Sequence, residues 1–159
     1  MNHAPPTTPV HEVMTQAPIS VTPDTTVGEL LALFDRHDFS AFPVTDREGV
    51  LRGIVAKLDV LRLFRPDERF RIPEFATIAS TSVRDMMRPG VITLEPGDSI
   101  VGVGDLMVET RLRSLPVVER RSGLPVLVGI VSQGDLLRRL RFAIVDELQA
   151  SGRGSHETG

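Results

Sequence analysis

The sequence predicts an α/β fold made of one unit written twice, in which each copy runs strand, helix, strand, strand, helix. Three observations predict it: an internal repeat, an apolar stripe with helical spacing in each copy, and short β-type runs around each stripe. At an offset of 73 residues, apolar residues and prolines of the first copy recur in the second. The recurring pairs are Val10 and Val83, Met14 and Met87, Ile19 and Ile92, Pro23 and Pro96, Leu33 and Leu106, Pro43 and Pro116, and Val44 and Val117.

The first copy contains these elements in order. A β-type run at residues 19–21 precedes a helix, for which Thr25 is the predicted N-cap. Two further runs at 42–44 and 53–55 flank turn-forming residues at 46–49, which indicates a β-hairpin, and a second helix follows. The apolar stripes are Val27, Leu30, Leu31 and Phe34 in the first helix, and Val60, Leu61 and Phe64 in the second.

The second copy repeats this order. A run at 92–94 precedes a helix with Asp98 as its predicted N-cap, and runs at 115–118 and 126–131 flank a turn at 119–123. The apolar stripes are Ile100, Val103, Gly104 and Met107 in the first helix, and Leu136, Leu137 and Leu140 in the second. The last helix continues as an amphipathic pattern to Ala150, and its surplus apolar face predicts a partner, most simply the other subunit of a homodimer.

Composition separates the two units from the segments around them. Segment 65–81 holds prolines among mixed charges and has no counterpart within a copy, which indicates a linker. Both ends of the chain are polar and rich in Gly or Pro. The predicted organisation is a disordered N-terminus at 1–8, a first unit at 9–64, a linker at 65–81, a second unit at 82–150 with an extended C-terminal helix, and a disordered tail at 151–159.

Composition and charge exclude several classes of protein. The 159 residues carry 18 basic and 21 acidic side chains, and a net charge of −3 argues against a nucleic-acid partner. The absence of cysteine excludes disulfides and cysteine zinc sites. We see no signal peptide and no apolar run long enough for a bilayer, so we expect a cytoplasmic protein with no membrane partner. Neither a metal site nor a catalytic constellation is predicted, so the chain is not expected to be an enzyme.

The closing segment of each copy relates the chain to a known family. After a three-residue insertion near Ser122 the offset becomes 76, and segment 53–59 falls on segment 129–135. Further matching features are the Val13-Met14 and Met86-Met87 starts and the Pro43-Val44 and Pro116-Val117 strands. With these features the chain resembles a tandem pair of cystathionine β-synthase (CBS) domains, a Bateman module, over residues 10–141.

This resemblance implies an architecture and a role. It implies two α/β units related by a pseudo-twofold axis and packed through their sheets. Two clefts between the units would hold adenosine-containing ligands such as AMP, ADP, ATP, S-adenosylmethionine or NAD, as regulatory ligands and not as required cofactors. It also implies a homodimer and a regulatory role toward another protein, which the sequence does not name.

The family's ligand motif is complete in the second copy, at Gly129, Ser132 and Asp135. A carboxylate can accept hydrogen bonds from both ribose hydroxyls, and a serine hydroxyl can reach sugar or phosphate oxygens. The resemblance implies that residues of the first copy complete the base pocket, and a basic residue before Pro116 is our first choice for meeting phosphate. The predicted ligand residues are Ala17, Ile19, Ser40, Ala41, Arg113, Ser132 and Asp135.

The first copy departs from the motif, because Ala56 stands where Ser or Thr is expected. The resemblance therefore implies a second cleft that is weaker or empty. Lys57 could meet a phosphate there or could stand in solvent. The predicted residues of this weaker site are Lys57, Asp59, Gly90, Ile92 and Ser114.

Both motifs also have a simpler interpretation. Segment 132–135 is an S-x-x-D capping box that would start the last helix, and Asp59 suits the first turn of a helix. Two hypotheses for function therefore remain. The first is a non-catalytic regulatory module that binds a ligand of the AMP, ADP and ATP class and signals to a partner protein. The alternative is a nucleotide-independent dimeric interaction module of the same fold.

Overall fold

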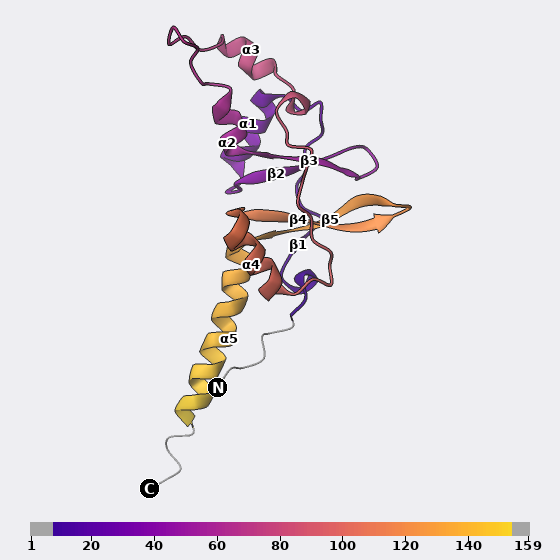
Figure 1. The fold of residues 1–159 in the computed structure, drawn as a ribbon, viewed down its shortest axis with the longest axis vertical. Helices are drawn as coiled ribbons and strands as arrows, with labels where there is room; N and C mark the ends of the chain where they lie inside the picture. Colours follow the sequence, from indigo (N-terminus) through magenta and orange to yellow (C-terminus); the bar gives the residue numbers. More distant parts are fainter. Residues whose placement is uncertain (1–7, 154–159) are drawn as a thin grey trace.

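The computed structural model describes residues 8–153 and shows two α/β units stacked through their β-hairpins (Figure 1). The hairpins face each other at the middle of the molecule, and the helices lie on the outer sides. The sheets meet where Val50 bridges Val126 and the amide of Leu127 donates to the carbonyl oxygen of Gly49 at 3.0 Å. The predicted fold class, two similar units packed through their sheets, is confirmed.

Each unit contains a β-hairpin between two helices. The first unit comprises α1 (Val27–Arg36), β2 (Ala41–Thr45), β3 (Leu51–Ala56) and α2 (Lys57–Arg62). The second unit comprises α4 (Ile100–Thr110), β4 (Ser114–Arg121), β5 (Leu124–Ser132) and α5 (Gln133–Arg153). The chain also forms β1 (Thr15–Gln16), α3 (Phe75–Ser80) and the 3₁₀ turns Val10–Glu12 and Val83–Asp85.

The first helix of each unit starts one residue later than the predicted N-cap would place it. Helix α1 is capped by Thr26, whose hydroxyl accepts from the amide of Glu29 at 3.3 Å, while the Glu29 carboxylate accepts from the amide of Thr26 at 3.1 Å. Helix α4 is capped by Ser99. The predicted caps Thr25 and Asp98 are wrong, because each accepts an amide N–H from three residues earlier and so closes the preceding turn.

The predicted strands at 19–21 and 92–94 are also wrong, since each run forms only a single parallel bridge. The amide of Val21 donates to the carbonyl oxygen of Pro43 at 3.0 Å, and its carbonyl accepts from the amide of Thr45 at 2.9 Å. A proline lies two residues beyond each run and lacks the N–H that a longer ladder would need.

The two hairpins of the molecule turn in different ways. The turn between β4 and β5 uses only Ser122 and Gly123, with φ of +51° and +79°, as in the two-residue turns that match the twist of the strands. Strand β4 therefore continues to Arg121, and the predicted turn at 119–123 is too long. The other hairpin turns at Asp46, whose carboxylate accepts two backbone N–H groups of the turn.

Each segment that precedes a unit in the sequence packs on the other unit. Val10 is fully buried in the core of the second unit, and Val83 is fully buried in the core of the first. The amide of Val10 donates to the carbonyl oxygen of Asp98 at 2.7 Å, and that of Val83 donates to Thr25 at 2.8 Å. The first residues of each copy therefore pack in the core of the other copy. The repeat alone did not predict this crossing.

The segment predicted as a linker is partly ordered as a helix. Helix α3 lies within residues 65–81, and its Ile78 is buried in the core of the first unit. In the part of the chain that the structure describes, no helix has the length and apolar character needed to span a membrane.

Ordered structure at both ends of the described chain includes residues that were predicted to be disordered. Helix α5 reaches Arg153, so residues 151–153 are helical and not part of a disordered tail. Thr8 is also ordered, since its carbonyl oxygen accepts from the amide of Ile100 at 3.0 Å. The predictions for residues 1–7 and 154–159 lie outside the described residues.

Candidate functional site

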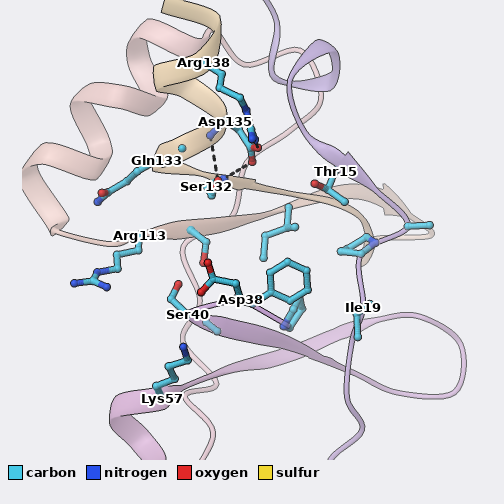
Figure 2. Close-up of a pocket in the computed structure, with 18 residues that line it drawn as sticks. Thr15, Ile19, Asp38, Ser40, Lys57, Arg113, Ser132, Gln133, Asp135 and Arg138 are labelled. Atoms are coloured by element: carbon cyan, nitrogen blue, oxygen red, sulfur yellow. Dashed lines mark hydrogen bonds and ion pairs between the residues drawn. The ribbon is translucent and has the colours of Figure 1, made fainter. Parts of the chain in front are cut away.

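A cavity of about 720 Å³ opens between the two units (Figure 2). Its wall is formed by the segment after β1, the residues around the start of β2, the first residue of α2, the start of β4, and the junction of β5 with α5. All of the residues predicted for the first ligand site lie on this wall, namely Ala17, Ile19, Ser40, Ala41, Arg113, Ser132 and Asp135. The structure therefore brings them together, while their contact with a ligand stays a prediction.

The side of the cavity formed by segment 17–19 and the start of β2 carries small and apolar side chains. Ala17 has a φ of +45°, in the left-handed region that residues with a β-carbon rarely occupy. Its amide donates to the carbonyl oxygen of Val128 at 3.4 Å, which ties this segment to β5. Because Ala17 and Ala41 lack bulky side chains, this side leaves room for a flat apolar group.

Asp135 lies in the first turn of helix α5 and also lines the cavity. One carboxylate oxygen accepts from the amide of Ser132 at 2.8 Å, and the Ser132 hydroxyl accepts from the amide of Asp135 at 3.1 Å. The other oxygen accepts from the guanidinium of Arg138 at 2.5 Å (Figure 2). The capping role predicted for this motif is confirmed. It does not exclude a ligand, because a carboxylate offers about four acceptor positions.

Two cations reach the cavity from opposite units. Arg113 precedes β4 in the second unit, and Lys57 is the first residue of α2 in the first unit (Figure 2). They are opposite partners of one repeated hydrogen bond, since the amide of Lys57 donates to the carbonyl oxygen of Ser40 at 3.1 Å and that of Gln133 donates to the carbonyl oxygen of Arg113 at 2.9 Å. Both cations therefore border the same cavity.

The structure corrects the position of two residues assigned to the weaker site. Lys57 and Ser114 line the same cavity as Asp135 and not a separate cleft around Asp59. The reason is the packing of the hairpins, which brings the start of α2 and the start of β4 to one space between the units.

Four polar residues that line the cavity were not predicted as site residues from the sequence: Thr15, Asp38, Gln133 and Arg138. Arg138 could have been found, because it follows Asp135 by three residues, the spacing of an ion pair on a helix. Thr15 and Asp38 belong to no motif. In Figure 2, Asp38 projects from the first unit into the space between the units.

The residues predicted for the weaker site are not brought together in the same way. Asp59 is buried, and its carboxylate accepts from the amide of Ala56 at 2.8 Å and from the guanidinium of Arg62 at 2.9 Å. Arg88 is also ion-paired to it, at 3.2 Å. Asp59, Gly90 and Ile92 are not among the residues that line the large cavity.

Comparison with known proteins identifies the family. A sequence model of the CBS domain matches the chain twice, at residues 10–66 and 83–142. The chain belongs to the CBS domain family. Because the matches lie in tandem, the protein is a CBS pair, and the resemblance found in the sequence is confirmed.

The CBS pair has relatives of similar length. The CBS domain-containing protein YhcV of Bacillus subtilis is 29% identical over 127 residues, which cover 80% of this chain and 81% of YhcV. The crystal structure of CBSX2 from Arabidopsis thaliana in complex with AMP has a TM-score of 0.71 and 26% identity, and the match covers 85% of this chain and 97% of that one.

A more distant CBS pair supports the fold alone. It is the CBS domain pair of protein MJ0100 in complex with 5′-methylthioadenosine and S-adenosyl-L-methionine. The two chains are 21% identical with a TM-score of 0.70, over 87% of this chain and 99% of that one.

Proposed function

We propose that this CBS pair is a non-catalytic regulatory module that binds an adenosine-containing ligand, of the AMP, ADP and ATP class, in the cavity beside Asp135. The observation that supports the proposal is the convergence of residues from both units on one cavity, including every residue predicted for the first ligand site. A ligand in this position would contact both units. It would therefore change how they pack and could signal to a partner protein.

The size and polarity of the cavity suit a nucleotide. Its volume of about 720 Å³ falls in the range of roughly 300–1,000 Å³ that is usual for small-molecule sites. We place the adenine against segment 17–19 and Ala41, the ribose diol at Asp135, and the phosphate near Arg113 and Lys57. The carboxylate oxygens of Asp135 would then accept from the ribose hydroxyls, and the two cations would pair with the phosphate.

The ion pair between Asp135 and Arg138 does not prevent this arrangement. The Arg138 side chain is 73% exposed, whereas that of Asp135 is 12% exposed. Because the guanidinium lies mostly in solvent, the ion pair is partly screened and contributes less than a fully buried pair would. Arg138 can therefore turn into solvent, or toward a ligand phosphate, when a diol occupies the carboxylate.

The surface of the helices supports the proposed homodimer. Large apolar side chains are exposed on α2 and α5, which begin at equivalent positions of the two units. They are Leu58, Leu61, Leu137, Phe142, Ile144 and Leu148. Groups of exposed large apolar side chains on a helix favour a site where another protein binds. We propose that a second copy of the chain covers part of it and that the regulated protein contacts the dimer.

A thermal-shift screen tests the proposed ligand class. The wild-type protein should be stabilised by at least one of AMP, ADP, ATP, S-adenosylmethionine and NAD. A ligand at 100 times its dissociation constant contributes about 2.7 kcal/mol, which corresponds to a shift of roughly 5–10 °C for a chain of this size. The effective ligand should give no shift with Asp135→Asn, because the amide keeps the cap acceptor for Ser132 but loses the carboxylate.

The matched control is Asp59→Asn, which makes the same change at the equivalent carboxylate outside the cavity. Its ligand-induced shift, measured from its own ligand-free midpoint, should equal that of the wild type. A shift that survives Asp135→Asn would mean that the ligand binds elsewhere.

The alternative is a nucleotide-independent interaction module. The observation that favours it is the reciprocal cap between Ser132 and Asp135, which already explains both residues without a ligand. This alternative predicts no shift with any of the five ligands and a homodimer that forms in their absence.

A further inference from the structure

The two carboxylates of the repeat stand in nearly identical surroundings. Asp59 is the third residue of α2, and Asp135 is the third residue of α5. Each accepts from the backbone amide three residues before it, at 2.8 Å in both units. Each also pairs with an arginine three residues after it, Arg62 at 2.9 Å and Arg138 at 2.5 Å. These shared contacts do not explain why Asp135 lines the large cavity and Asp59 does not.

Besides the replacement of Ser132 by Ala56, the surroundings differ at a position of the segments that cross between the units. Thr15 is paired with Ile130 on β5, and Arg88 is bridged to Ile54 on β3. Ile54 and Ile130 are equivalent positions of the repeat, as are Thr15 and Arg88. The same place beside the carboxylate is therefore held by a short hydroxyl side chain in one unit and by a long guanidinium in the other.

The guanidinium of Arg88 occupies this place. Its Nε and Nη2 both lie 3.2 Å from Oδ1 of Asp59, the same oxygen that accepts from Arg62. The Asp59 side chain is only 3% exposed, against 12% for Asp135. At the equivalent place in the other unit, Thr15 lies on the wall of the open cavity (Figure 2).

We propose that Arg88 is a built-in plug, which takes at Asp59 the place that the ribose diol takes at Asp135. This inference rests on the proposed function and adds that each chain holds one nucleotide, although the fold repeats the site twice. The plug is effective because a neutral diol that displaced Arg88 would take a cation away from a buried carboxylate. Arg88 thus blocks the half of the repeat that already lacks the serine of the motif, and Thr15 leaves the other half open.

The direct test transplants the plug. Thr15→Arg places the same side chain in the same register beside Asp135, and AMP affinity measured by titration calorimetry should fall by at least about tenfold, the factor that corresponds to 1.4 kcal/mol. Thr15→Gln is the matched control, because it adds length without charge, and it should retain most of the affinity. Unchanged AMP binding by Thr15→Arg would overturn the proposal.

The reverse test opens the second site. Arg88→Thr combined with Ala56→Ser reproduces at Asp59 the residues found at Asp135, and the calorimetric stoichiometry should rise from one AMP to two per chain. Should this double variant fail to fold, Thr15→Arg still decides the question. Two AMP molecules per wild-type chain would overturn the plug alone, whereas no AMP-class binding to the wild type would overturn the proposed function and the plug together.

Discussion

A Gly53→Ala variant is expected to lose about 1–3 kcal/mol of unfolding free energy, the usual cost of forcing a group into a packed region. A β-carbon on Gly53 would lie 2.7 Å from the carbonyl oxygen of Arg88 and 3.1 Å from the sulfur of Met87. The oxygen belongs to the backbone of the crossing segment, which is hydrogen-bonded to Ile54 in both directions, at 3.0 and 2.9 Å. This neighbour cannot move aside as the end of a flexible side chain could.

The matched control for this variant is Gly102→Ala. A β-carbon there would meet no atom within 4 Å apart from its chain neighbours and the backbone of its own helix, and Gly102 lies inside helix α4. The control should be unchanged or stabilised by up to about 1 kcal/mol, because alanine favours helix more than glycine does. Urea unfolding measures the unfolding free energy of both variants. A Gly53→Ala protein as stable as the wild type would contradict the close packing of the Arg88 backbone against Gly53.

Phe42→Ala is expected to cost more, about 3–5 kcal/mol of unfolding free energy. Phe42 is completely buried at the centre of the first core, with ring centroids 4.9 Å from Phe34 and 5.7 Å from Phe39. Its neighbours in β2, Ala41 and Pro43, line the cavity. Truncation should therefore weaken ligand binding as well as stability, because one wall of the cavity loses its support.

Phe70→Ala is the control for this loss. Phe70 is 89% exposed, so its truncation should change stability by no more than about 0.5 kcal/mol. The two variants remove the same side chain from opposite environments and are compared by the same urea unfolding experiment. Equal stabilities of the two variants would contradict the described core.

The fold was predictable because its main elements leave strong local patterns. Helical spacing of apolar residues, β-type runs and the doubled order of both indicate two α/β units. The crossing of the first residues was not predictable, because Val10 and Val83 carry the same pattern whichever core they enter. The N-caps were misplaced by one residue because Thr25 and Thr26 are adjacent residues that can both accept a backbone N–H.

The candidate site was predictable where it depends on a motif. Ser132 and Asp135 belong to the closing segment, and the residues from the other copy follow from the family resemblance. Lys57 was assigned to the wrong site, because its position depends on how the two hairpins pack against each other. The Arg88 contact was missed for a related reason, since Arg88 reaches Asp59 only through the crossing of the chain.

A crystal structure of the protein grown with saturating AMP tests the central claim most directly. We predict AMP in the cavity between the units, with both ribose hydroxyls within hydrogen-bond distance of the Asp135 carboxylate and the phosphate beside Arg113 and Lys57. An empty cavity at saturating AMP, or AMP bound away from Asp135, would contradict the claim.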